Sequence, residues 1–137
     1  MLKGSCVCGD FTYELSEGAP EAVLICHCIP CQKTAGPNGS YNVIVKEDEF
    51  KQLSGISKPF VRKGESGKNI SYDLCDNCGT IMGCSIDAMP GVYNVKAGTL
   101  DDRGYWEKNG KPVQEIFTRN RPSWCGEFQG ADQKNGA

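Results

Sequence analysis

The chain has 137 residues, of which 39% are hydrophobic and 23% charged, and this balance excludes an intrinsically disordered protein and fits a single globular domain. The formal net charge is -2, with 15 lysines and arginines against 17 aspartates and glutamates, so nucleic acid is not a favoured partner. The N-terminus lacks the apolar run of a signal peptide and no segment looks able to span a membrane, so we expect an intracellular, cytoplasmic protein.

Short strands are the elements that the sequence predicts most often. Apolar and polar residues alternate, as they do in half-buried strands, over residues 11–15, 41–45, 59–62, 69–72, 92–96 and 113–117. Helical periodicity over ten or more residues is absent, although one short turn of helix is expected between Pro30 and Gly36. The sequence therefore predicts a small, mainly β, antiparallel domain over residues 1–126, followed by a flexible tail over 127–137.

Cysteine is the residue type that carries most information. The nine cysteines are Cys6, Cys8, Cys26, Cys28, Cys31, Cys75, Cys78, Cys84 and Cys125. The count is odd, no secretory signal is present, and neighbours one or two residues apart bridge poorly because a disulfide needs a particular distance and dihedral angle. Clustered thiols in a reducing compartment are typical of metal binding. We therefore expect zinc rather than a disulfide framework.

Two of the clusters have the form of half of a structural zinc site. Cys6 and Cys8 are followed by a glycine, and Cys75 and Cys78 by Gly79, which gives the backbone freedom that a tight turn needs after its second ligand. Two such half-sites supply four sulfurs, the number that a closed tetrahedral zinc requires. A redox dithiol is the alternative, but such a motif usually opens a helix after a buried strand.

The stretch CHCIPC, residues 26–31, supplies three further sulfurs from Cys26, Cys28 and Cys31. Three protein ligands with one open position are typical of a catalytic zinc. His27, the only histidine, is a candidate fourth ligand, but in an extended segment its side chain projects away from those of its neighbours. We favour a hydrogen-bonding role for it. Cys84 and Cys125 are the other candidates, and a lone cysteine is more often a small buried hydrophobe.

The division into four plus three is an inference, and spacing leaves another open. Cys26 and Cys28 pair with Cys75 and Cys78 in that alternative, and the N-terminal pair takes a different role.

Three cysteine motifs in this order resemble a known family. GSCVCG at 4–9, CHCIPCQKTAG at 26–36 and CDNCG at 75–79, together with the Arg-Pro-x-Trp ending at 121–124, are similar to the glutathione-dependent formaldehyde-activating enzyme (GFA) family, whose domain also occurs in centromere protein V. The resemblance runs from about residue 2 to residue 126.

The resemblance implies a β-rich, tent-like fold with two zincs. It assigns a structural zinc to Cys6, Cys8, Cys75 and Cys78, and an active-site zinc to the cysteines of CHCIPC. It also implies a carbon–sulfur lyase that joins glutathione to formaldehyde, giving S-(hydroxymethyl)glutathione. The charge of several thiolates at one metal would need offsetting, for which we consider Lys33, His27 and the amides after Cys31.

A glutathione pocket would need donors for two carboxylates. Lys33, Lys68, Arg119 and Arg121 are available, although each is individually more often a solvated charge. Two other classes of function remain open beside a zinc enzyme. One is a binding module in which both zincs are structural, and the other is a thiol-based metal or redox sensor. The oligomeric state is not indicated.

Overall fold

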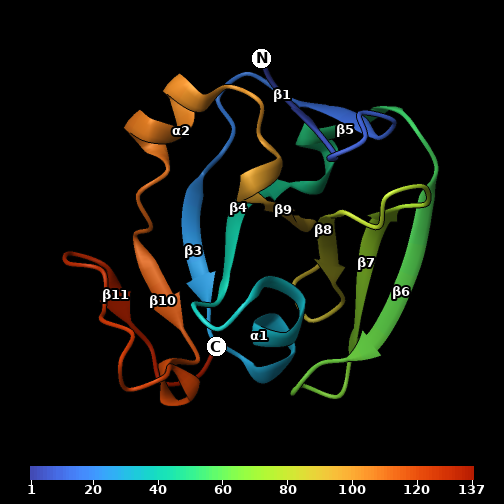
Figure 1. The fold of residues 1–137 in the computed structure, drawn as a ribbon. Coiled ribbons are helices and arrows are strands. Elements are labelled where there is room, and N and C mark those ends of the chain that lie inside the picture. Colours follow the sequence, from blue (N-terminus) through green and yellow to red (C-terminus); the bar gives the residue numbers. More distant parts are fainter.

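The computed structural model describes residues 1–137, and its main feature is a long, curved sheet with a smaller one packed across one end (Figure 1). The small sheet has the order β1-β2-β5, formed by Leu2–Ser5, Thr12–Leu15 and Phe50–Ser54. The large sheet has the order β11-β10-β3-β4-β9-β8-β7-β6, and its strands are Asp132–Gln133, Gln114–Ile116, Ala22–Cys26, Ser40–Lys46, Val92–Lys96, Ile81–Ile86, Asn69–Cys75 and Ser57–Lys63.

The helices are short. The α-helices are α1, Ile29–Ala35, and α2, Arg103–Asn109, and three 3₁₀ turns complete the elements: η1 (Glu47–Glu49), η2 (Ala97–Thr99) and η3 (Thr118–Asn120). None of the helices has the length and apolarity needed to cross a membrane. All six expected strand regions are strands, and the turn of helix expected between Pro30 and Gly36 is α1. The mainly β prediction is therefore confirmed.

One face of the large sheet packs against the small sheet and forms the apolar core. Val43 and Val45 of β4 and Val95 of β9 are fully buried there, beside Tyr13 and Leu15 of β2. Side chains alternate between the two faces of a strand, so Asn42 of β4 and Asn94 and Lys96 of β9, which flank these valines, lie on the opposite face. The sheet thus has an apolar face and a second, polar face.

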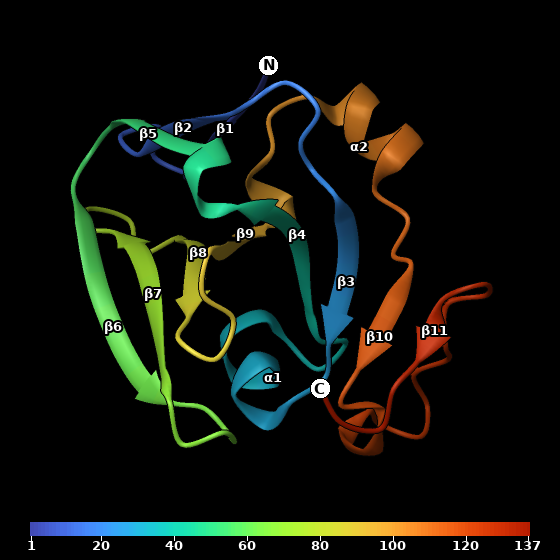
Figure 2. The ribbon, with the colours of Figure 1, turned by 180° about the vertical axis from the view of Figure 1, so that it is seen from behind.

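The polar face carries side chains from strands that are far apart in the sequence. Register places Asn94, Cys84 and Tyr72 in one row across β9, β8 and β7. It also places Asn42 of β4 opposite Lys96, which lies two residues from Asn94 on the same face of β9. Helix α1 follows β3 directly and contacts β4. Viewed from either side, α1 appears within the curve of the large sheet (Figures 1 and 2). These polar residues and α1 therefore lie on the same side of the large sheet.

The structure differs from the sequence prediction at three places. Strand β10 runs parallel to both β3 and β11, so the large sheet is mixed rather than purely antiparallel. Residues 127–137, expected to be a flexible tail, instead hydrogen-bond to β10, because Asp132 N donates to Val113 O and Lys134 N to Glu115 O, each at 2.9 Å. Helix α2 has only seven residues, too few to show a helical period.

Glycine at position 83 is required by close packing inside the large sheet. A Cβ atom there would lie 2.6 Å from Asn94 O and 2.6 Å from Cε1 of Tyr93, so backbone would have to move. We expect Gly83→Ala to lower the free energy of unfolding by about 1–3 kcal/mol, as overpacking does. Gly98→Ala is the matched control, because nothing lies within 4 Å of its Cβ position. Urea denaturation measures both, and equal stabilities would contradict the packing argument.

Candidate metal centres

Four sulfurs meet where the small sheet contacts the turn between β7 and β8. The Sγ atoms of Cys6, Cys8, Cys75 and Cys78 all lie within 4.8 Å of one another. Both glycines that follow the pairs have left-handed backbones, with φ of 83° at Gly9 and 74° at Gly79, as expected for these turns. Their amides close the turns by donating to Cys6 O at 3.1 Å and to Cys75 O at 2.9 Å.

Backbone and hydroxyl groups also contact these sulfurs. Phe11 N donates to the Sγ atom of Cys6 at 3.2 Å, and the hydroxyl of Thr80 lies 3.1 Å from the Sγ atom of Cys78. Such donors favour the ionised thiolate, which is the form that binds metal. The four sulfurs match the number and arrangement of a tetrahedral metal site, and the alternative pairing of Cys26 and Cys28 with Cys75 and Cys78 does not occur.

Three sulfurs meet at the junction of β3 and α1. Cys26 ends β3, Cys28 caps the N-terminus of α1, and Cys31 lies in its first turn, one residue after Pro30. Their Sγ atoms also lie within 4.8 Å of one another. The Cys31 amide donates to the Sγ atom of Cys28 at 3.4 Å, whereas the sequence analysis had named the amides after Cys31. Cys26 and Cys31 are buried and Cys28 is half-buried.

No fourth cysteine, histidine or carboxylate joins this cluster. Cys84 is buried on the polar face but outside the group, and Cys125 bonds weakly to the neighbouring Gly126 O at 4.0 Å. The Nε2 atom of His27 lies 2.8 Å from Oε1 of Glu115 instead. The hydrogen-bonding role favoured for His27 therefore matches its contacts, and the cluster offers three sulfurs, one fewer ligand than a closed tetrahedral zinc site uses.

The ionisation of each of the three thiols depends on the other two. Hydrogen bonds from Cys26 and Cys31 hold the pKa of Cys28 below its usual range, against the effect of burial, and Arg62 acts in the same direction. The same contact with Cys28 raises the pKa of Cys26. One thiolate at Cys28 is thus favoured first, and ionising the others needs further positive charge.

Two cations on the polar face lie near this cluster, and the sequence prediction had selected neither. The Nε atom of Arg62 donates to Tyr72 Oη at 2.8 Å, and its Cζ atom lies 5.6 Å from the centre of that ring. The Nζ atom of Lys96 lies 5.9 Å from the same ring. Despite burial, the bond to Tyr72 and the thiols of Cys28 and Cys31 raise the pKa of Arg62 above its ordinary value. The charge of Arg62 favours the thiolate of Cys28, and the charge of Lys96 favours that of Cys31.

Lys96 retains a free donor. Its Nζ atom donates to Ser40 Oγ at 2.6 Å and to Asn42 Oδ1 at 2.8 Å, which uses two of its three protons. The buried Nδ2 group of Asn94, on the same face of β9, has no partner. These are donors without acceptors, so the polar face is suited to an anionic or carbonyl group.

A cavity of about 480 Å³ lies beside Lys96, within the size range of small-molecule sites. Its walls include Thr34 of α1, Ser40 of β4 and Thr80 before β8, and Lys96 is its only charged lining residue. The hydroxyl of Thr34 donates to Cys31 O at 3.2 Å, so the cavity wall includes a residue of the helix that carries Cys31, although none of the three cysteines lines the cavity.

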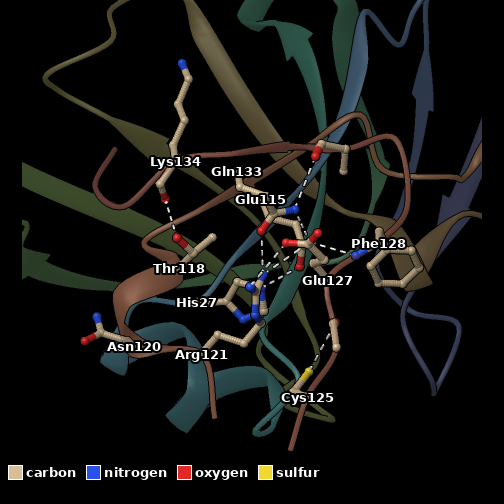
Figure 3. A network of polar contacts seen from close by, with 12 residues as sticks. His27, Glu115, Thr118, Asn120, Arg121, Cys125, Glu127, Phe128, Gln133 and Lys134 are labelled. Carbon is tan, nitrogen blue, oxygen red and sulfur yellow. Dashed lines mark hydrogen bonds and ion pairs between the residues drawn. The ribbon is translucent and has the colours of Figure 1, made fainter. Parts of the chain in front are cut away.

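The cations expected to recognise carboxylates lie elsewhere. Lys33 and Lys68 are exposed, and Arg119 pairs with Glu65 on the surface at 2.8 Å. Arg121 belongs to a buried network around Glu115 (Figure 3). Alternation along the strand places Lys96 on the polar face, whereas the approach of Arg62 to Tyr72 follows from the pairing of β6 with β7.

Comparison with known proteins gives one match to a protein family. No curated protein matches the chain. The crystal structure of a Rhodobacter sphaeroides protein is similar at a TM-score of 0.58 and 18% identity, covering 73% of this chain and 88% of that one, which supports the fold alone. A family model described as glutathione-dependent formaldehyde-activating enzyme matches residues 1–120. The match spans most of the sequence, and the chain therefore belongs to the family of glutathione-dependent formaldehyde-activating enzymes.

Proposed function

We propose that the protein is a zinc-dependent carbon–sulfur lyase that joins glutathione, or a similar small thiol, to formaldehyde or a related aldehyde. The single observation that carries the proposal is the cluster of Cys26, Cys28 and Cys31, which brings three sulfurs together with no fourth protein ligand. The family match supports glutathione-dependent formaldehyde activation as the reaction class.

Zinc fits both groups of sulfurs by its donor chemistry. The four-sulfur group, Cys6, Cys8, Cys75 and Cys78, would hold a structural zinc, and the three-sulfur group a catalytic one with an open position. A zinc bound there supplies a lowered pKa for a thiol that reaches it.

Side chains of the protein compensate the charge at the sulfurs and bind the substrate. In the reaction the sulfur of glutathione bonds to the carbonyl carbon of formaldehyde, the carbon–oxygen π bond breaks, and the thiol proton ends on the oxygen. Arg62 and Lys96 offset negative charge beside the sulfurs, and the free donor of Lys96 binds a carboxylate of glutathione. The cavity beside Lys96 holds part of the tripeptide. These roles place thiol and anion recognition on one face of the sheet.

Metal content tests the two-zinc assignment. We expect about two zinc ions per chain in the wild type and about one in Cys28→Ser, because removing one of three sulfurs leaves too few ligands. Cys125→Ser is the control, since Cys125 lies outside both clusters, and it should keep both ions. Atomic emission on protein purified under reducing conditions measures the content. Two zinc ions retained in Cys28→Ser would contradict the assignment.

Exchange NMR with ¹³C-formaldehyde tests the reaction itself. Formaldehyde adds to thiols without help, so the quantity to measure is the rate of formation of S-(hydroxymethyl)glutathione above the rate without protein. We expect the wild type to accelerate this exchange and Cys28→Ser to match the rate without protein. No acceleration by zinc-loaded wild type would refute the enzymatic proposal.

Comparing a thiol that has carboxylates with one that has none tests whether Lys96 binds a carboxylate of the substrate or acts only through its charge near the sulfurs. Lys96→Met should raise the KM for glutathione about tenfold, the loss expected for one charge-assisted hydrogen bond of about 1.5 kcal/mol. The KM for 2-mercaptoethanol, which has no carboxylate, should change little. Lys33→Met is the matched control, because that lysine is exposed on α1. An equal effect on both thiols would refute the assignment of Lys96.

A further inference from the structure

The last eleven residues, 127–137, lie beyond the residues that the family model matches and run along β10. We call this segment the C-terminal strap. Besides the bonds from Asp132 and Lys134 to β10, the amides of Phe117 and Thr118 donate back to Gly136 O at 2.8 Å and Lys134 O at 3.0 Å. Residues 132–136 of the strap are therefore held by backbone hydrogen bonds to β10 and to the residues that flank it.

The strap also supplies side-chain and backbone donors to one buried carboxylate. Glu115 of β10 is 1% exposed, and its Oε2 atom accepts from Gln133 Nε2 at 2.6 Å and from Phe128 N at 2.9 Å. Arg121 lies 3.4 Å from the same oxygen and donates to Gln133 Oε1 at 2.6 Å. Burial alone would raise the pKa of Glu115, but the bonds from Gln133, His27 and Phe128, together with Arg121, hold it below its ordinary value.

The other oxygen of Glu115 contacts His27, the residue between two cysteines of the three-sulfur cluster. Oε1 lies 2.8 Å from Nε2 of His27, and Figure 3 shows the two side chains pointing toward one another. His27 stands between Cys26 and Cys28 in the chain. Its backbone is held as well, because His27 N donates to Ile116 O at 3.0 Å and His27 O accepts from Gln32 at 3.0 Å. The residue between two of the sulfurs is thus fixed at three points.

We propose that the C-terminal strap is a positioning element for the three-sulfur cluster, acting through Glu115 and His27. Gln133 orients the carboxylate, the carboxylate orients the imidazole, and the imidazole sets the path of the chain between Cys26 and Cys28. The inference rests on the proposed metal at these sulfurs. Partners one shell beyond the ligands of a metal typically change its affinity about tenfold or more when they are removed.

Gln133→Ala in the full-length chain tests the strap. Cobalt in both sites reports sulfur coordination through its charge-transfer absorption, and a chelator then removes it. We expect release from the three-sulfur site to be about tenfold faster in Gln133→Ala, with release from the four-sulfur site unchanged. Lys134→Ala is the matched control, because only the backbone of Lys134 makes hydrogen bonds, and it should behave as the wild type. Glu115→Gln should accelerate cobalt release from the three-sulfur site more than Gln133→Ala does.

A second readout needs no metal. His27 is the only histidine, so its Nε2 resonance is a single signal, and it should shift in Gln133→Ala and stay in place in Lys134→Ala. An unmoved signal overturns the inference, as does equal or unchanged cobalt release from both sites. Absence of cobalt from the three sulfurs of the wild type overturns the proposed function and the inference with it. These outcomes are distinguishable in one set of samples.

Discussion

The meeting of Cys6 and Cys8 with Cys75 and Cys78 is the constraint on which the rest of the structure depends. These pairs are separated by 67 residues between Cys8 and Cys75, and together they join the small sheet to the turn between β7 and β8. Closing a loop of that length costs chain entropy, which a metal bound by four sulfurs can offset as part of the folding free energy. Cys6 and Cys75 belong to the same buried core as the residues of β2, β4 and β9, so the closure joins the two sheets at their shared apolar interface.

Because the apolar face of the large sheet is buried in the core, the residues that could bind a ligand lie on its polar face. Polar residues of β4, β9, β8 and β7 share this face, and α1, which begins at the three-sulfur cluster, contacts β4. The two cations near Tyr72 come from β6 and β9. Residues distant in sequence thus share one site because strand register aligns them. The Cys26–Cys28 segment is held from the opposite side by Glu115 and the C-terminal strap, so the cluster lies between a region suited to ligands and a region that positions it.

The sequence analysis predicted the local features that short-range patterns determine. The strands follow from alternation, α1 from Pro30 and Gly36, and the tight turns after Cys8 and Cys78 from Gly9 and Gly79. Spacing favoured a division of the sulfurs into four and three but left another open, and the fold shows the four-plus-three division. Features that depend on long-range register were missed. The parallel pairing of β10 brings Glu115 to His27, and no local pattern indicates it. Arg62 and Lys96 were overlooked for the same reason, whereas Lys33, Lys68, Arg119 and Arg121 were considered only because they are charged.

The measurement that tests the account most directly is the absorption spectrum of the cobalt-substituted protein during titration with glutathione. Cobalt bound by three sulfurs and water absorbs differently from cobalt bound by four sulfurs. The account predicts that glutathione converts one of the two cobalt centres to four-sulfur character and leaves the other, held by Cys6, Cys8, Cys75 and Cys78, unchanged. Two centres that already have closed coordination and do not respond to glutathione would contradict it and favour a zinc-stabilised binding module.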